Sequence, residues 1–312
     1  MAQAGRPLNR HARPWQLAVF LGPALAVYVA FSAGPLLETL GLAFYRAEDS
    51  GATVFVGLEN FRTILGDAEW SAAFWNAMRN NALFFAVHMV VQNGIALALA
   101  ALLSLKALRF AKGYRTLIFL PTLLSVVIVG FIWQLILSPL WGVGGRLLGF
   151  VGLQEWFGPW LGLEETALLT VSLISVWQYV GIPMMLIYAA LLAVPEDILE
   201  AAHAEGAGPW RIFFAIQLPL IAPTLGLVTI LTFVGNFNAF DLVYSIKGAL
   251  AGPNYATDIL GTLFYRTFFG YQAQVGSATM GAAVATLMLL VILAGVGLYF
   301  FAVQRRLVRH AL

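Results

Sequence analysis

Six long stretches without a charged residue divide the chain and constrain its fold more than any other feature. They cover residues 15–37, 80–105, 116–145, 166–195, 212–240 and 267–304. The shortest has 23 residues, and a helix needs about 20 apolar residues to cross the hydrocarbon core of a bilayer. Their apolar residues lack the two-residue alternation of barrel strands. We therefore predict an all-α integral membrane protein with six transmembrane helices, near residues 15–37, 82–105, 116–138, 166–192, 219–243 and 276–303.

Composition supports a bilayer environment and excludes several protein classes. Charged residues make up 10% of the chain and apolar residues 61%, against about 25% and 45–50% in soluble domains. The formal net charge of +2 is too small for the electrostatic footprint of a nucleic-acid partner. The chain has no cysteine, which excludes disulfides, thiol catalysis and thiolate metal sites.

The distribution of basic residues predicts the orientation. Six spans put both termini on one side, and cytoplasmic loops carry the excess of Lys and Arg. Of the 17 basic residues, 11 fall in one alternating set of segments. We therefore predict that residues 1–14, 106–115, 195–218 and 305–312 are cytoplasmic.

The N-terminus has one alternative interpretation, because three arginines precede the first apolar run, as in a secretory signal. The apolar core of a signal spans about 7–15 residues, whereas this run has 23. We expect an uncleaved first span. The predicted organisation is a cytoplasmic segment 1–14, a single transmembrane domain 15–304 and a cytoplasmic tail 305–312.

Motifs for enzymatic chemistry are missing from the sequence. It contains no GxxxxGK[ST] nucleotide loop, no HExxH and no GxSxG. The histidines, His11, His88, His203 and His310, do not have metal-ligand spacing. The spans also lack the paired carboxylates of a proton relay. Asp241, near the outer end of the fifth span, is the only acid that comes close to an intramembrane position. We predict neither a metal site nor an enzyme.

The segment between the fourth and fifth spans has the signals of two short helices. Pro195, Glu196 and Asp197 suit a first helical turn, where acids favour the helix dipole. Gly206 can adopt positive φ and end that helix, and Pro209 can begin a second one. These signals predict a rigid elbow beneath the membrane. The simpler alternative is a loop that only connects two spans.

The same segment resembles a known family signature. Residues 200–202 read EAA, Gly206 follows after three residues, and residues 216–219 read IQLP. This pattern is similar to the EAA motif, EAA–x3–G–x9–I–x–LP, of permease subunits in bacterial binding-protein-dependent ABC importers. Glu205 stands where the family more often has Asp and keeps the charge. Residues 56–61 resemble the outer GLxNF element of the family. Residues 236–241, followed by 252–253 and 256–257, resemble the carbohydrate branch, and more narrowly the first permease of maltose and glycerol-3-phosphate type pairs.

The resemblance implies a type I importer fold in the bacterial inner membrane, with the elbow docked on an ATPase subunit. It also implies four kinds of partner: a second, related permease, two copies of an ATPase, an extracytoplasmic solute-binding protein and membrane lipid. ATP and Mg²⁺ would bind the ATPase subunits, with no cofactor on this chain. The residues expected to couple this chain to the ATPase are Glu200, Ala201, Ala202, Glu205, Gly206 and Ala207.

Polar residues within the spans indicate where a solute could pass, since such groups tend to face cavities or neighbouring helices. The predicted path residues are Ser175, Gln178, Tyr179, Thr232, Gly235, Asn236, Asn238 and Asp241. They fall on spans four and five, the stretches that form the solute site in the maltose system, where Ile182 and Ala239 also align. Asn81, His88 and Gln92 follow one another along span two. The alternative is that these groups only hydrogen-bond between helices, which we favour for His88.

We therefore predict a permease subunit of an ATP-driven importer for a sugar or sugar-like solute. No cation lies within a span, which favours neutral sugars over phosphates. The rival interpretations are a standalone channel or secondary carrier, which would need its own gate or coupling-ion site, and an ABC exporter subunit, which would lack the EAA elbow.

Overall fold

A computed structural model of the protein describes residues 14–48, 52–105, 108–140, 143–150, 152–272 and 275–301. Helices dominate these ranges, and the strands within them are β1 (Tyr45–Ala47) and β2 (Thr53–Phe55), which pair antiparallel with Tyr45 opposite Phe55. The predicted terminal segments lie outside the described residues, apart from Pro14.

Three helices are long and apolar enough to cross a membrane without a sharp bend. They are α1 (Pro14–Tyr28) continued through η1 (Val29–Ala33) and α2 (Gly34–Leu42), α4 (Ala68–Val87) continued through η2 (His88–Gln92) and α5 (Asn93–Leu103), and α17 (Ala278–Tyr299). They coincide with the first, second and sixth predicted spans.

The second of these helices starts earlier than predicted. It begins at Ala68 rather than near residue 82, because Asp67 caps it and no proline interrupts the following turns. The Asp67 Oδ1 accepts hydrogen bonds from the backbone N–H groups of Glu69 at 3.0 Å and Trp70 at 3.2 Å. The helix that begins after Asp67 and the second predicted span are therefore one continuous helix.

The other three predicted spans are bent pairs rather than straight helices. In the first pair, α6 (Ala111–Phe119) with η3 (Leu120–Leu123) meets α7 (Val126–Ile136) at a bend of 97°. In the second, α9 (Glu164–Tyr179) meets α10 (Gly181–Leu192) at 45°. In the third, the segment from α12 (Pro209–Ile212) through α13 (Leu218–Leu220) meets α14 (Ala222–Phe237) at 67°. Prolines 121, 183, 219 and 223 stand close to the three breaks. Proline lacks the backbone donor that a continuous helix needs.

The fifth predicted span, 219–243, also ends early. Helix α14 stops at Phe237, and the non-helical residues Asn238 and Ala239 separate it from α15 (Phe240–Lys247). The polar run in residues 236–241 thus contains a break in the backbone instead of a helical face.

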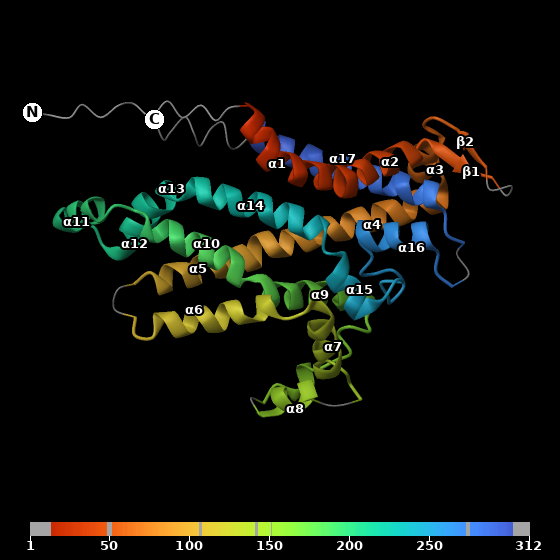
Figure 1. Ribbon diagram of the computed structural model, residues 1–312. Helices are drawn as coiled ribbons and strands as arrows, with labels where there is room; N and C mark the ends of the chain where they lie inside the picture. The colour runs from red at the N-terminus through yellow and green to blue at the C-terminus, as the bar shows by residue number, and fades with distance from the viewer. Residues whose placement is uncertain are drawn as a thin grey trace, which may run out of the picture.

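The helices of the body run side by side along one axis (Figure 1). At one end lie the connection between α5 and α6 and the segment with α11 (Glu196–Ala204) and α12; α1 starts and α17 finishes toward the same end. The β-hairpin, α3 (Glu59–Gly66) and α16 (Leu260–Phe269) lie at the opposite end. Two of the four segments predicted to be cytoplasmic, 106–115 and 195–218, therefore share one end of the body.

Small side chains allow close helix packing in the core. Ala96 and Ala100 on α5 are fully buried in one cluster with Met184 and Ile187 on α10. On α17, a Cβ built at Gly281 would lie 2.7 Å from the Phe268 Cβ, so only glycine permits this approach to α16. The first of these contacts holds α10, which is one of the helices around the cavity described below.

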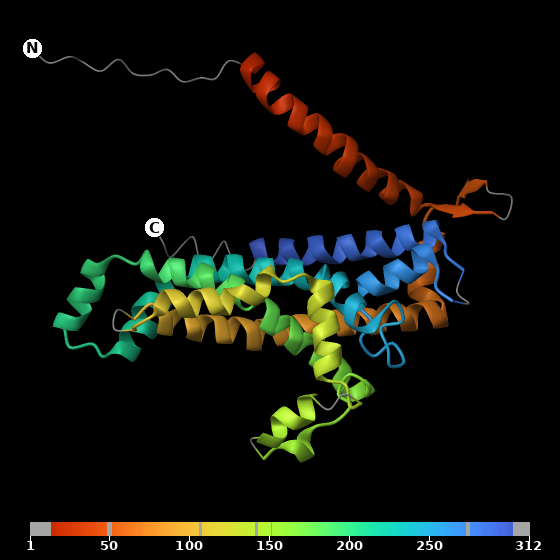
Figure 2. The same cartoon turned by 60° about the horizontal axis from the view of Figure 1, so that its bottom comes forward.

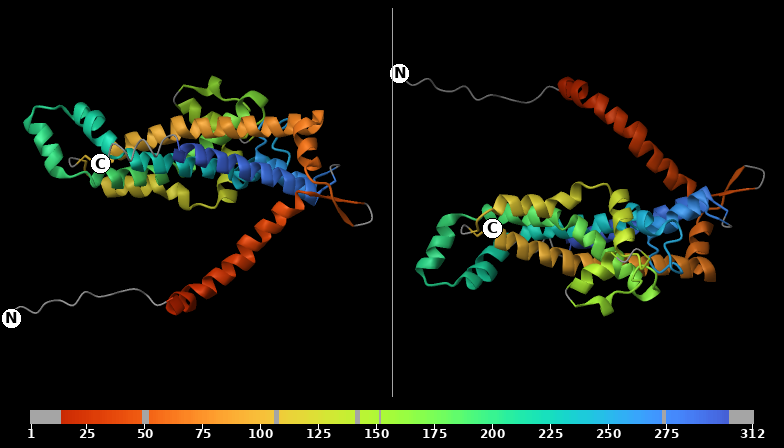
Figure 3. Two further views of the ribbon diagram at one scale, coloured as in Figure 1. Left: turned by 90° about the horizontal axis from the view of Figure 1, so that it is seen from above. Right: turned by 90° about the horizontal axis from the view of Figure 1, so that it is seen from below.

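Two parts of the molecule leave the body. Helices α1 and α2 lean away from it and return only at the hairpin end (Figure 2), and none of the apolar window in this first helix is buried. Helix α7 and α8 (Val143–Phe150) project sideways (Figure 3). Their exposed apolar side chains include Phe20, at 80% exposure, and Phe150, at 88%.

Candidate functional site

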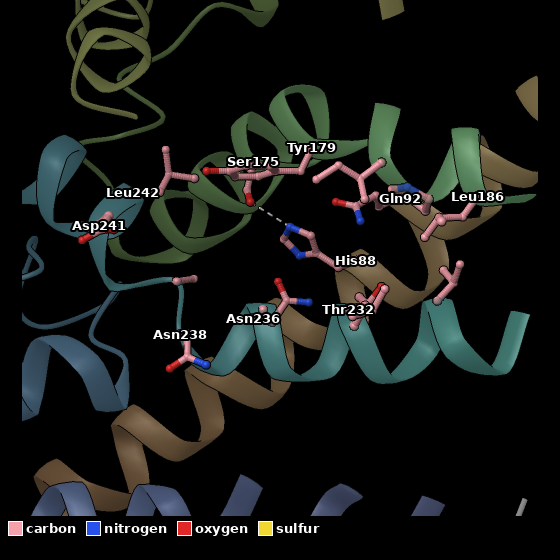
Figure 4. A pocket seen from close by; sticks show the side chains of 16 residues that line it. His88, Gln92, Ser175, Tyr179, Leu186, Thr232, Asn236, Asn238, Asp241 and Leu242 are labelled. Carbon is pink, nitrogen blue, oxygen red and sulfur yellow. Dashed lines mark hydrogen bonds between the residues drawn. The ribbon is translucent and has the colours of Figure 1, made fainter. Parts of the chain in front are cut away.

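A cavity of about 390 Å³ lies inside the body between η2, α9, α10, α14 and α15 (Figure 4). Most of its wall is apolar, with a few polar groups converging on it, as in typical small-molecule sites. The lining residues are His88, Gln92, Ser175, Tyr179, Ile182, Pro183, Leu186, Val228, Leu231, Thr232, Gly235, Asn236, Asn238, Ala239, Asp241 and Leu242.

A hydrogen-bonded pair connects two walls of the cavity. The His88 ring lies with Nδ1 2.7 Å from the Phe84 carbonyl oxygen and Nε2 2.9 Å from the Ser175 Oγ. A carbonyl only accepts, so the network assigns the proton of the neutral ring to Nδ1. The Ser175 hydroxyl then donates to Nε2, which leaves the lone pairs of its oxygen available to accept.

Two polar atoms on the wall have no hydrogen-bond partner within the described part of the chain. They are the Gln92 Oε1, an acceptor, and the Asn236 Nδ2, a donor. Both side chains are only 5% exposed. An unpartnered buried polar group costs about 1–3 kcal/mol, so a ligand that hydrogen-bonds to either atom would remove that cost.

Other polar contacts near the cavity hold the helices together. The Asn81 Nδ2 donates to the Asn236 carbonyl oxygen at 3.1 Å, and the Asn81 Oδ1 accepts from the Leu260 N–H at 2.8 Å. The Asn93 Nδ2 donates to the Thr232 Oγ1 at 3.2 Å. Asn81 therefore has the interhelical role considered for the polar residues of span two.

The cavity has one charged side chain among its lining residues, the carboxylate of Asp241 at the α15 end (Figure 4). Asp241 also borders a second cavity of about 540 Å³. Ser125 and Gln134 on the α7 side and Tyr244 and Ser245 on α15 contribute to that second wall. The two cavities thus combine one negative charge with uncharged hydrogen-bonding groups.

The structure gathers most of the residues chosen from the sequence, with one correction. Seven of the eight line the cavity, namely Ser175, Tyr179, Thr232, Gly235, Asn236, Asn238 and Asp241. Gln178 does not. Its side chain is fully buried, and its Nε2 donates to the Leu124 carbonyl oxygen at 3.2 Å, beside the break between η3 and α7. Gln178 therefore does not face this cavity, because one helical step from Tyr179 turns it away.

Span two contributes more residues to the cavity than the sequence predicted. His88 does form an interhelical hydrogen bond, as favoured, but it also lines the cavity. Gln92 lines the cavity as well and was not among the path residues. Their common feature, a π-turn in an otherwise α-helical segment, has no sequence signal that we recognise. Within the described residues no group of three or more His, Asp or Glu side chains has metal-binding geometry.

The segment of residues 195–218 forms the predicted elbow. Helix α11 begins after Pro195 and ends at Ala204, two residues before Gly206, whose φ is +80°. The Gly206 N–H donates to the His203 carbonyl and the Ala207 N–H to the Ala202 carbonyl, both at 3.0 Å, in the manner of a glycine C-cap. Helix α12 starts at Pro209 and continues into the π-turn η5 (Phe213–Gln217).

The elbow exposes most of the residues chosen for coupling. Glu200, Ala201, Glu205 and Gly206 are exposed, and Ala207 is half-buried. Ala202 is buried, at 8% exposure. Trp210, at 76% exposure, adds an apolar surface beside them.

Comparison with known proteins identifies the family. The profile of the family described as "Binding-protein-dependent transport system inner membrane component" matches residues 94–311. The chain belongs to this family. A probable ABC transporter permease protein of Bacillus subtilis, YurN, is 32% identical over 278 residues, covering 88% of this chain and 91% of YurN. The importer interpretation is thereby confirmed over a standalone channel or carrier.

Further relatives and a solved structure agree with this permease assignment. The lactose transport system permease LacF of Rhizobium radiobacter is 29% identical, covering 92% of this permease and 94% of LacF. The sn-glycerol-3-phosphate permease UgpA of Salmonella typhimurium is 30% identical, covering 93% and 94%. A bacterial alginate ABC transporter chain superposes with a TM-score of 0.75 at 22% identity, covering 93% of both chains. The permease therefore has the type I ABC importer fold and is a multi-pass inner-membrane protein.

Proposed function

We propose that this permease forms part of the path for a neutral sugar or sugar-like solute in an ATP-driven importer. The observation that carries the proposal is the cavity wall, which combines amide, hydroxyl and aromatic groups without a cation among its lining residues. Hydroxyl groups of a sugar both donate and accept, so they match the Gln92 acceptor and the Asn236 donor. Tyr179 supplies an aromatic face for a sugar ring.

The names of several relatives support a carbohydrate. They include permeases for lactose, for arabinooligosaccharides and for starch degradation products. The glycerol-3-phosphate relatives carry an anionic solute. The negative charge of Asp241 in the wall disfavours an anion here, since like charges repel.

The proposed topology has six spans, three straight and three bent, with both termini in the cytoplasm. The basic segments and the shared end of the segments 106–115 and 195–218 support it. Labelling a single cysteine at position 203, in this cysteine-free chain, tests the orientation. We expect an impermeant thiol reagent to label it only from the cytoplasmic side, and labelling from outside would contradict the topology.

The proposed assembly contains this chain, a second permease, two ATPase subunits and an outer binding protein. ATP and Mg²⁺ belong to the ATPase subunits, and this chain contributes the elbow. Glu200 on α11 would pair with a basic ATPase residue, while Gly206 and Ala207 would allow close approach. The unpartnered apolar surface of α1 and α2 suits the second permease or lipid.

The test is uptake by the complete importer in proteoliposomes. The panel contains lactose, maltotriose and arabinotriose as neutral sugars and glycerol 3-phosphate as the anionic comparison. We expect uptake of at least one neutral sugar, strictly dependent on ATP and the binding protein. Transport by this chain alone, or transport of glycerol 3-phosphate only, would contradict the proposal.

A further inference from the structure

The wall that span two contributes to the cavity is built on a π-turn. In η2 the Asn93 N–H bonds to the His88 carbonyl, five residues back, instead of four. Single π-turns within α-helices occur frequently at functional sites. Val90 in this turn is 75% exposed, on the outer surface, whereas His88 and Gln92 point into the body and line the cavity. The turn therefore places Val90 on the outer surface and His88 and Gln92 on the cavity wall.

Gln92 has the environment of a ligand-binding group. It is 95% buried, it lines the cavity, and its Oε1 has no hydrogen-bond partner among the described residues. Asn236 lines the same cavity from α14, and its Nδ2 is likewise unpartnered. An acceptor and a donor left open in one cavity are the complement of a hydroxyl group.

We propose that Gln92 contacts the transported solute directly, by accepting a hydrogen bond from one of its hydroxyls, and that His88 is a positioning residue. This inference rests on the proposed function, since it requires that the cavity receives the solute. His88 acts through Ser175. The His88 Nε2 accepts a hydrogen bond from the Ser175 hydroxyl, which fixes the direction of the O–H and leaves the serine oxygen free to accept from other donors. Span two thereby forms a third wall of the solute site, in addition to spans four and five.

Gln92→Met is the first test, because Met keeps the length of the side chain and removes the strong acceptor. The matched control is Gln178→Met. Gln178 is also buried with an unpartnered Oε1, but it lies outside the cavity lining. In the complete importer we expect Gln92→Met to raise the KM for sugar uptake about three- to tenfold, the range for one lost hydrogen bond. We expect Gln178→Met to leave this KM unchanged.

A series of monodeoxy analogues of the transported sugar makes the test specific. For the analogue that lacks the contacted hydroxyl, wild type and Gln92→Met should have the same KM, because the interaction is already missing. A merely structural role of Gln92 would raise the KM of every analogue alike. That result, or equal KM values for wild type and Gln92→Met with every sugar, would overturn the inference.

His88 is tested by a double-mutant cycle with Ser175. His88→Phe should raise the sugar KM in the wild-type background and should have no further effect in Ser175→Ala. Additive effects would overturn the positioning role. If the wild-type importer takes up no neutral sugar of the panel, the proposed function fails and this inference fails with it. A working wild type with silent Gln92 variants overturns this inference alone.

Discussion

Two buried polar clusters, one beside α16 and one in the cavity, differ in how far their groups satisfy one another. In the first, Arg266 donates to both carboxylate oxygens of Asp258, at 2.6 and 2.5 Å, and the Thr262 hydroxyl donates to the same carboxylate at 2.7 Å. The Asn80 Nδ2 donates to the Asp258 carbonyl oxygen at 2.9 Å. In the cavity, Gln92 and Asn236 each keep an unpartnered atom.

In our proposal, the contrast separates polar groups that hold the fold from polar groups that bind the solute. The Asp258 and Arg266 cluster ties α16 and the preceding loop to α4, and it is almost fully buried. Removing one partner of such a pair leaves an uncompensated charge, at a cost of about 3–5 kcal/mol. The unpartnered atoms of Gln92 and Asn236 already destabilise the fold when no solute is bound. Their replacement should therefore reduce transport without reducing stability.

The largest effect is expected from Arg266→Met. It leaves the Asp258 carboxylate buried without its cation, and we expect a loss of about 3–5 kcal/mol in the free energy of unfolding. The measurement is thermal unfolding of the purified chain in detergent. Arg46→Met is the control, because the Arg46 and Glu59 pair is half exposed and should contribute about 0–1 kcal/mol. Equal stability of the two variants would show that the buried Asp258 and Arg266 pair does not hold the fold.

Transport should also be lost without any change to either cluster. Gly206→Val forces a β-branched residue to φ of +80°, which costs about 1–2 kcal/mol of local strain. Glu200→Lys reverses an exposed charge on α11. We expect both variants to insert and assemble with the second permease, but to lose ATPase association or sugar-stimulated hydrolysis. Co-purification measures ATPase association, and proteoliposomes give the sugar-stimulated rate of ATP hydrolysis. Normal values of both quantities in both variants would show that the elbow only connects two spans.

Asn236→Leu should affect function and stability in opposite ways. It removes the unpartnered donor, so we expect uptake to fall about tenfold or less, consistent with one lost hydrogen bond. The unfolding temperature should stay the same or rise, because an unsatisfied buried group disappears. Uptake and thermal unfolding are measured on the same preparation. A clear loss of stability would show that Asn236 belongs with the structural cluster.

The smallest effect is expected from Asp241→Asn. The side chain is exposed and keeps its oxygen acceptor, so uptake of a neutral sugar should change about twofold or less. Uptake of an anionic solute, glycerol 3-phosphate, should rise relative to that sugar as the negative charge is removed. The ratio of the two uptake rates is the measurement. An unchanged ratio would show that Asp241 does not filter charge.

Sequence reasoning located the parts of this fold that depend on local signals. The uncharged stretches predicted the spans, and Gly206 and Pro209 predicted the end of one short helix and the start of the next. The bends were missed because a proline near a span marks a break only when neighbouring helices satisfy the freed backbone groups. The 97° turn after η3 is such a case: Gln178 donates to the freed Leu124 carbonyl there.

The candidate site was predictable only in part for a related reason. Helical spacing identified the faces of spans four and five, and seven of the eight residues line the cavity. Spacing alone does not say which polar residue finds a partner on a distant helix, as Gln178 does with Leu124. Nor does it reveal the π-turn that turns Gln92 inward. Both depend on tertiary contacts between segments far apart in the sequence.

The most direct test of the central claim is protection of a cysteine at position 236 by the transported sugar. In the complete importer under turnover with ATP, a small thiol reagent should label Asn236→Cys, and the sugar should slow this labelling in proportion to its occupancy. Labelling of a cysteine at position 203, on the exposed elbow, should not respond to sugar. Labelling at 236 that is equally fast with and without sugar would show that the open polar groups of the cavity do not receive the solute.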